Sequence, residues 1–210
     1  METIRQIVEL ISINRYKNGS SDIMEHIMTL YKYAKECDSV FETGVRGCIS
    51  SWAFLYGLLD NNNESKKRFF LNDIETCDIN DLLEISKNFD NIDVKYEWKN
   101  NLDIEFSENY DITFIDTWHI YGQLKRELEK FSKITNKYII MHDTTIDEIY
   151  GESIRGGHNM QAESERSGIP VEEIAKGLGP AIFEFLRDHP EWYIKEKYTN
   201  NNGLTILAKR

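Results

Sequence analysis

Long apolar runs are missing from this sequence. No stretch approaches the roughly 18 consecutive apolar residues that a membrane-spanning helix needs. The first residues, METIRQIVELISINRYK, mix acidic with apolar side chains, and they lack the basic start and uniform apolar centre of a signal peptide. We therefore expect no membrane partner and a cytoplasmic protein.

Basic residues are outnumbered by acidic ones. The chain has 25 Lys and Arg against 36 Asp and Glu, which gives a formal net charge of −11 at pH 7. Proteins that bind nucleic acids usually present a basic face that neutralises phosphates, and this sequence shows no basic cluster. The charge argues against DNA, RNA or an anionic membrane as the main partner.

Cysteine is rare and shows no metal-binding pattern. Cys37, Cys48 and Cys77 are scattered, odd in number and without CxxC spacing. This is typical of reduced thiols in an intracellular protein, and we expect no zinc site built from them. The composition, with 40% hydrophobic and 29% charged residues, is that of a soluble globular protein. Since neither an internal repeat nor a low-complexity linker is present, we expect residues 1–210 to form a single domain.

Residues 110–145 have the pattern of a strand, a helix and a second strand. Apolar runs stop at Asp116 and at the pair His142-Asp143, and His119 follows Asp116 by three residues. Continuous apolar runs are typical of buried parallel strands, and open α/β sheets bind ligands at the carboxyl ends of such strands. We expect these four polar residues to form the chemical centre, although each could instead cap a helix or pack.

The other elements follow from hydrophobic spacing and from turn residues. The sequence predicts helices over residues 2–13, 22–37, 50–60, 79–89, 121–134 and 181–190. The first two form an N-terminal helical part, residues 1–38, with Ser21 or Asp22 as the cap of the second helix. The sequence predicts strands near residues 40–43, 68–73, 92–98, 112–115, 138–141, 192–198 and 203–208. The short loop between the last two strands makes them an antiparallel hairpin.

A glycine-containing turn follows the first predicted strand. Gly44 and Gly47 would let the backbone approach a ligand, and Ser50 or Ser51 can cap the helix that begins there. The free N–H groups of that helix start suit a carboxylate or phosphate. The spacing is not the GxGxxG of dinucleotide-binding proteins, so a plain turn remains open. Asp73 ends the next strand, where nucleoside-binding sheets hold ribose hydroxyls.

Residues 146–176 form a polar connection that is long for a simple link between strand and helix. Long insertions beside a site often act as lids or substrate loops. Glu152, Arg155 and His158 are polar groups that this segment could bring to a substrate.

The motifs FETGVRG, FFLND, FIDTWH and YIIMHDTT, in this order, resemble the class I S-adenosylmethionine-dependent methyltransferases. The resemblance covers roughly residues 40–210. It implies an α/β fold, a Rossmann-like three-layer αβα sandwich around a seven-stranded, mostly parallel sheet. The terminal hairpin would supply the antiparallel strand of that sheet.

The chain is more closely similar to the metal-dependent O-methyltransferases that act on sugars. This group contains rhamnosyl and macrolide-sugar methyltransferases and proteins labelled cephalosporin hydroxylases. Its members carry a strand-end Asp, a His three residues later and an acidic pair that ends the next strand. His142 departs from that pair, whose first member is commonly Glu or Asp, and FETGVRG departs from the commoner ExGxGxG.

The resemblance implies a role for each matching residue. It places the cofactor S-adenosylmethionine against Glu42, Gly44, Gly47, Ser50, Asp73 and Asp116, with Asp73 on the ribose. It implies a divalent ion, Mg²⁺ or Mn²⁺, held by Asp116, Asp143 and His142. It makes His119 the general base.

These roles fit the chemistry of methyl transfer to a hydroxyl. The sulfonium already carries an activated methyl, so the protein mainly positions the acceptor, a metal ion stabilises the forming alkoxide and a histidine takes the proton. We expect a sugar or glycan hydroxyl as acceptor, and a homo-oligomer is compatible with the sequence. A catechol-like or other small phenol is the alternative acceptor. A Rossmann-like nucleotide-binding module without methyl transfer is the alternative of another class.

Overall fold

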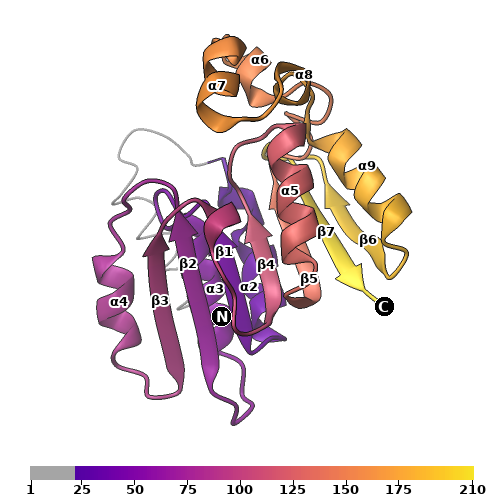
Figure 1. Ribbon diagram of the computed structural model, residues 1–210. Coiled ribbons are helices and arrows are strands. Elements are labelled where there is room, and N and C mark those ends of the chain that lie inside the picture. The colour runs from indigo at the N-terminus through magenta and orange to yellow at the C-terminus, as the bar shows by residue number, and fades with distance from the viewer. Residues whose placement is uncertain (1–21) are drawn as a thin grey trace. The chain divides into compact units, whose positions relative to one another are not determined.

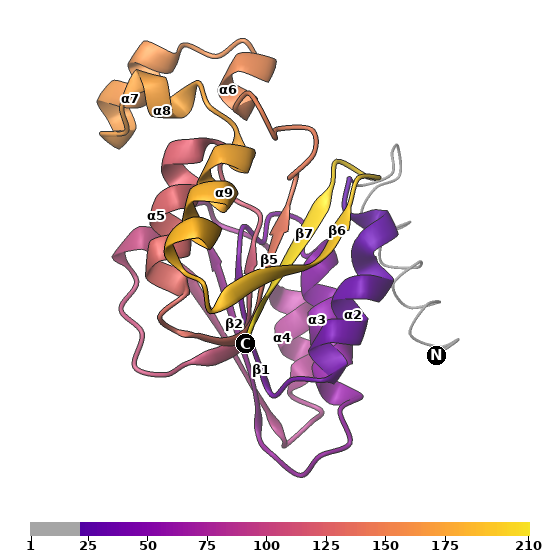
Figure 2. The ribbon, with the colours of Figure 1, turned by 90° about the vertical axis from the view of Figure 1, so that its right-hand side faces the viewer.

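The computed structural model of the chain describes residues 22–210 (Figures 1 and 2). The predicted helix over residues 2–13 and the predicted cap Ser21 lie outside the described residues. Within residues 22–210, no helix combines the length and the apolarity that crossing a membrane requires.

Seven strands form one sheet in the order β3-β2-β1-β4-β5-β7-β6. Strands β1, β2 and β3 pair in parallel, whereas β7 runs antiparallel to both β5 and β6. Helices flank the strands. The predicted Rossmann-like α/β fold, with a mostly parallel seven-stranded sheet and an antiparallel terminal hairpin, is confirmed.

The described chain divides into two compact units. The first consists of the described residues up to 105 together with residues 110–114, and the second consists of residues 106–109 and 115–210. Whether the chain behaves as one domain, as the sequence predicts, stays a prediction.

The first unit carries the parallel strands and the early helices. Its elements are η1 (Met24–His26), α2 (Ile27–Lys35), β1 (Ser39–Thr43), α3 (Ile49–Leu59), β2 (Lys67–Asp73), α4 (Asn80–Ser86), β3 (Ile92–Trp98), η2 (Asn101–Asp103) and most of β4 (Tyr110–Ile115). Strand β1 and helix α3 are buried almost throughout, as expected of elements inside a layered core, although β1 also buries the polar side chains of Ser39, Glu42 and Thr43.

Helices α2 and α3 pack against each other at a glycine. A Cβ atom on Gly57 would lie 2.5 Å from Ala34 Cβ and 2.6 Å from the carbonyl oxygen of Tyr31. Only a residue without a side chain allows these two backbones to come so close, so Gly57 fixes the spacing of the two helices.

The second unit carries the terminal hairpin and the later helices. Its elements are α5 (Tyr121–Phe131), β5 (Thr135–His142), α6 (Glu152–Arg155), α7 (Met160–Ser167), α8 (Val171–Ile174), α9 (Leu178–Asp188), β6 (Trp192–Tyr198) and β7 (Leu204–Lys209). Helices α5 and α9 lie side by side (Figures 1 and 2). Helix α5 buries the face carrying Leu124, Leu128 and Phe131, which is the face that its spacing predicts.

The predicted lid, residues 146–176, is not an irregular loop. It contains the three short helices α6, α7 and α8, which lie together in Figures 1 and 2. Ile120 packs in a small apolar cluster with Ile169 and Ile174 of this segment, and Trp118 Nε1 donates a hydrogen bond to Ser153 Oγ at 3.2 Å. The segment is therefore docked on residues 118–121, and whether it opens stays a prediction.

Candidate functional site

The glycine turn after β1 is built from left-handed backbone. Gly44 has φ 91°, Arg46 has φ 40° and Cys48 has φ 60°. Positive φ is uncommon for residues with a side chain, and such conformations occur where the surrounding structure imposes them. The turn predicted from Gly44 and Gly47 is therefore a tightly specified loop that leads into α3.

Ser50 does not cap α3, and this prediction is wrong. The N-cap position is Cys48, and it makes no side-chain cap hydrogen bond. The Ser50 hydroxyl instead donates to Glu42 Oε1, and both side chains are buried. A buried carboxylate needs hydrogen-bond donors more than a helix end does, because the helix end can find other partners. Glu42 and Ser50, which are both predicted to bind the cofactor, thus form a hydrogen bond with each other.

Asp73, at the end of β2, holds the same turn. Its Oδ2 accepts a hydrogen bond from the backbone N–H of Arg46 at 2.9 Å, and its Oδ1 accepts one from the backbone N–H of Glu75 at 2.9 Å. Thr43 Oγ1 donates to Asn72 Oδ1 at 2.8 Å beside it. The first unit therefore brings together Glu42, Ser50, Asp73 and the glycine turn, and their role toward a cofactor stays a prediction.

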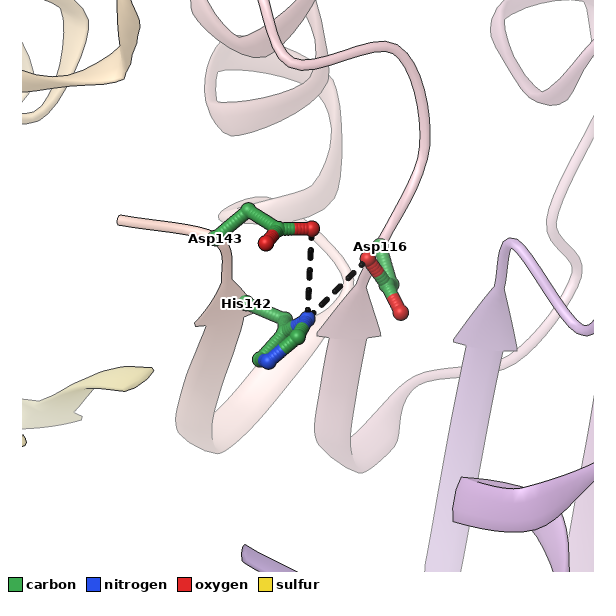
Figure 3. Close-up of side chains that lie close together, drawn as sticks. All are labelled: Asp116, His142 and Asp143. Atoms are coloured by element: carbon green, nitrogen blue, oxygen red, sulfur yellow. Dashed lines mark ion pairs between the residues drawn. The ribbon is translucent and has the colours of Figure 1, made fainter. Parts of the chain in front are cut away.

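The four residues predicted as the chemical centre converge in the second unit. Asp116 Oδ1 lies 3.1 Å from His119 Nε2 and 3.5 Å from His142 Nδ1. Asp143 Oδ2 lies 3.2 Å from His119 Nε2 and 3.3 Å from His142 Nδ1. Figure 3 shows Asp116, His142 and Asp143 pointing toward one another. The two carboxylates thus face the same two ring nitrogens.

The backbone at the end of β5 explains how neighbouring residues can face one point. Consecutive side chains in an extended strand point to opposite faces. Asp143, immediately after the strand, has φ 56°. Asp tolerates this left-handed conformation better than most residues. The turn brings its carboxylate to the side of His142, as Figure 3 shows.

His142 is oriented by the terminal hairpin. Its Nε2 lies 3.0 Å from the backbone carbonyl oxygen of Asn201, in the turn between β6 and β7. Because a carbonyl only accepts, Nε2 carries a proton, and Nδ1 is the nitrogen that faces Asp116 and Asp143. Burial alone would lower the pKa of His142, but the two carboxylates outweigh it and raise the pKa to about 10.

His119 lies between two pairs of carboxylates. Its Nε2 faces Asp116 and Asp143, and its Nδ1 lies 2.8 Å from Glu152 Oε2 and 3.4 Å from Asp147 Oδ2. Burial opposes the charged ring, yet the carboxylates of Asp116, Asp147 and Glu152 raise the pKa of His119 well above its usual value. Burial would raise the pKa of Asp116, but the contacts with His119 and His142 lower it.

Sequence reasoning missed Asp147 and gave its neighbours a different role. Asp147 is fully buried, and its two oxygens accept hydrogen bonds from Arg155 Nε at 2.7 Å and Nη2 at 2.8 Å. Glu152 and Arg155, predicted to reach a substrate, contact His119 and Asp147 instead. His158 pairs with Glu163 at 3.1 Å. The four-residue spacing from Asp143 to Asp147 was the available signal, but it is weak without the turn between them.

The donor set suits a cation. Within residues 22–210, Asp116, His142 and Asp143 offer ligand atoms that lie within 4.8 Å of one another, and so do His119, Asp147 and Glu152. Asp143 Oδ1 is buried and has no hydrogen-bond partner among the described residues. Four carboxylates meet one guanidinium here, so the site favours added positive charge, which protons on the imidazoles or a metal ion can supply.

Comparisons with known proteins give structural matches only. No protein-family model matches the sequence, and neither does any curated protein. The structure is similar to an O-methyltransferase from Bacillus cereus in complex with S-adenosylhomocysteine, with a TM-score of 0.59 and 16% identity, covering 100% of this chain and 91% of the other.

Two further solved structures extend this result. The O-methyltransferase TomG from Streptomyces achromogenes, in complex with S-adenosylmethionine, has a TM-score of 0.61 and 10% identity, covering 96% of this chain and 88% of that one. The N-methyltransferase NodS from Bradyrhizobium japonicum, in complex with S-adenosylhomocysteine, has a TM-score of 0.56 and 11% identity, covering 99% and 97%. At such low identity the matches show the fold alone, and that fold is the one these methyltransferases share.

Proposed function

We propose that the chain is an S-adenosylmethionine-dependent O-methyltransferase that acts on a hydroxyl group of a sugar or glycan. The observation that carries the proposal is the fold match, over nearly the whole chain, to O-methyltransferases solved with S-adenosylmethionine or S-adenosylhomocysteine. N-methyltransferases share the fold, so the choice of oxygen rests on the resemblance of FIDTWH and YIIMHDTT. No nucleic acid or membrane partner is proposed, and a homo-oligomer is compatible.

Cofactor binding is the first part to test. Isothermal titration of the full chain with S-adenosylmethionine should give one binding event in the micromolar range. NAD should give none, because the turn lacks the GxGxxG spacing. Absence of heat at high micromolar S-adenosylmethionine would remove the proposal, and binding of NAD instead would favour the nucleotide-binding module.

The metal-assisted part rests on the strand-end donors. Asp116, Asp143 and His142 would hold a divalent ion, which when bound polarises an acceptor hydroxyl. The resemblance gives the proton-accepting role to His119, and this role stays a prediction. Full activity after exhaustive dialysis against EDTA would contradict metal assistance.

A panel of acceptor compounds tests which class of hydroxyl is methylated. Radiolabelled methyl transfer to rhamnosides and other sugars should exceed transfer to catechols and simple phenols. Preference for a catechol would keep the reaction and replace the acceptor, since vicinal phenolic hydroxyls also suit a metal with carboxylate ligands.

A further inference from the structure

His119 and His142 occupy equivalent positions toward the same two oxygens. His119 Nε2 lies 3.1 Å from Asp116 Oδ1 and 3.2 Å from Asp143 Oδ2. His142 Nδ1 lies 3.5 Å and 3.3 Å from the same atoms. A general base would be expected to face the acceptor rather than the metal ligands. A fourth ligand would be expected to lie where His119 lies.

Four of the six distances among these donor atoms approach those in the coordination shell of one ion. Zinc binds histidine nitrogen and carboxylate oxygen at about 2.0–2.2 Å, so neighbouring donors around a tetrahedral ion are about 3.3–3.5 Å apart. The four distances in the structure, from 3.1 to 3.5 Å, lie close to this range. Six-coordinate ions with bonds near 2.1 Å bring adjacent donors to about 3.0 Å, which these contacts also approach.

We infer that Asp116, Asp143, His119 and His142 together bind one divalent transition-metal ion, with His119 as the fourth ligand. The four donors come from the ends of β4 and β5 and from the turn after β4. All four side chains are largely buried: the most exposed, Asp116, has 19% of its surface accessible.

Each histidine has a partner that fixes its other nitrogen. The Asn201 carbonyl accepts from His142 Nε2 at 3.0 Å, and Glu152 Oε2 lies 2.8 Å from His119 Nδ1. Metal-bound histidines usually donate their second N–H to a carbonyl or carboxylate, because that bond selects the tautomer and the ring orientation. His142 makes such a contact with a carbonyl, and for His119 the Glu152 carboxylate lies within ion-pair distance of the second nitrogen.

Glu152 is held for this task by backbone bonds. Its backbone N–H donates to the carbonyl oxygen of His119 at 3.0 Å, and its Oε2 accepts from the backbone N–H of His119 at 3.3 Å. Asp147 Oδ2 also lies near His119 Nδ1, and Asp147 Oδ1 accepts a hydrogen bond from Arg155 Nε. Helix α6 thus acts as a support for one ligand, which explains why Glu152 and Arg155 face inward.

The second group of possible ligands, His119, Asp147 and Glu152, does not form a separate metal site. Both oxygens of Asp147 already accept hydrogen bonds from the Arg155 guanidinium. A cation there would be repelled by that guanidinium. It would also require His119 to bridge two ions as an imidazolate. One ion per chain is therefore expected.

A donor set of two imidazoles and two carboxylates binds some metal ions more tightly than others. Mg²⁺ and Ca²⁺ prefer oxygen ligands and water, whereas imidazole suits zinc, cobalt, nickel and iron. The centre should bind Zn²⁺ and Co²⁺ far more tightly than Mg²⁺. His142, which departs from the acidic pair of the sugar methyltransferases, is one of the two residues that make this difference.

The use of this centre for methyl transfer rests on the proposed function, but the binding of the ion does not. If the ion binds as described and S-adenosylmethionine does not, the proposed function fails and the metal centre stands. If S-adenosylmethionine binds and the ion does not, the inferred metal centre fails and the proposed function stands.

Cobalt titration tests the centre. The full chain, freed of metal by dialysis against a chelator, is titrated with Co²⁺ while its visible absorption is recorded. We expect saturation at one equivalent, displacement by Zn²⁺, and no displacement by millimolar Mg²⁺. Saturation at two equivalents, or displacement by Mg²⁺, would overturn the inference.

Histidine variants decide whether His119 is a ligand. His119→Gln and His142→Gln should each lower Co²⁺ affinity by more than about 100-fold, since even outer partners of a ligand are worth 10–100-fold. X-ray absorption of the zinc form should show two imidazoles, and one in either variant. His189→Gln is the matched control, because His189 lies at the end of α9 and pairs with Glu129. Circular dichroism checks that each variant folds. A folded His119→Gln protein that keeps affinity and spectrum would overturn the assignment.

Discussion

The acids at the ends of β1 and β2 and those at the ends of β4 and β5 differ in what stabilises their charge. Glu42 accepts from the Ser50 hydroxyl, and Asp73 accepts from the backbone N–H groups of Arg46 and Glu75. Around Asp116 and Asp143 the donors are imidazole rings. The donors to the first group named here are neutral dipoles, and those to the second group are rings that gain or lose charge.

This difference separates two kinds of strand end. A hydroxyl or a backbone N–H keeps its proton at any ordinary pH, so its hydrogen bond to a carboxylate does not depend on pH. Such bonds give a turn one fixed shape. An imidazole between carboxylates can release its proton to solvent and bind a metal ion through the same nitrogen, whose position need not change. The first region is suited to present a rigid turn, and the second to hold a cation. The following changes test that contrast.

The largest effect is expected from Asp116→Asn. Asp116 Oδ1 contacts both histidines, so the variant removes a charged donor and weakens the position of two others. Metal affinity, measured by competition with a chromophoric chelator, should fall by more than about 100-fold, beyond the cost of losing an outer partner. Asp73→Asn, at the end of β2, should leave metal affinity unchanged. Equal losses of metal affinity in the two variants would show that the two groups of strand-end acids do not differ in cation binding.

Glu152→Gln should have a smaller effect on the same quantity. The amide keeps the shape of the side chain but no longer offers a charged acceptor to His119 Nδ1, so metal affinity should fall by about 10–100-fold. The matched control is Glu163→Gln, which removes the acid from the pair with His158. Because this pair contains none of the four proposed metal donors, the metal affinity of this control should equal that of the unmodified protein. A loss in the control comparable to that in Glu152→Gln would mean that the whole segment, rather than the His119 contact, sets the affinity.

Ser50→Ala tests the neutral kind of strand end. The variant leaves the Glu42 carboxylate buried without its hydroxyl donor, so the free energy of unfolding should fall by about 1–3 kcal/mol in urea denaturation. Ser51→Ala is the control, because the Ser51 hydroxyl is buried and has no hydrogen-bond partner among the described residues. Removing it should cost little or stabilise. Metal affinity should not change in either variant, and a change would show that the two regions are coupled.

The fold followed from the sequence because its signals are local. Apolar runs predicted the strands, and the short Asn-rich turn predicted the β6–β7 hairpin. The bounds were less certain: α5 ends at Phe131 rather than Ile134, and β5 begins at Thr135 rather than Tyr138. Residues 135–137 are Thr, Asn and Lys, so they belong to the strand without showing an apolar pattern.

The meeting of Asp116, His119, His142 and Asp143 was predictable because strand ends of a parallel sheet gather at one edge. The support around them was not. Glu152 lies 33 residues beyond His119, and their contact depends on the turns that follow Asp143. Ser50 was predicted as a cap because the sequence does not show that Glu42 is buried beside it. Contacts set by left-handed turns and by buried charge need the structure.

The smallest effect concerns the stability of the first unit in acid. Asp38 precedes β1, and its Oδ1 accepts from Lys67 Nζ at 2.8 Å and Asn63 Nδ2 at 2.7 Å. Partial burial would raise the pKa of Asp38, but these hydrogen bonds lower it to about 2. A carboxyl whose pKa is lower in the folded than in the unfolded chain stabilises the fold above the unfolded pKa, about 3.9, and loses this contribution as pH falls toward 2.

Asp38→Asn should therefore lower the free energy of unfolding at pH 6 by less than about 1 kcal/mol, because the Asp38 side chain is 40% exposed and screened. The difference between variant and unmodified protein should shrink between pH 4 and pH 2, as urea denaturation at several pH values can show. Asp90→Asn, which replaces an exposed acid of the same unit, is the matched control. A difference that stays constant on acidification would mean that Asp38 acts through its shape rather than its charge. Asp38 would then be held by neutral hydrogen bonding, as Asp73 is, and the Lys67 ammonium would contribute nothing through its charge.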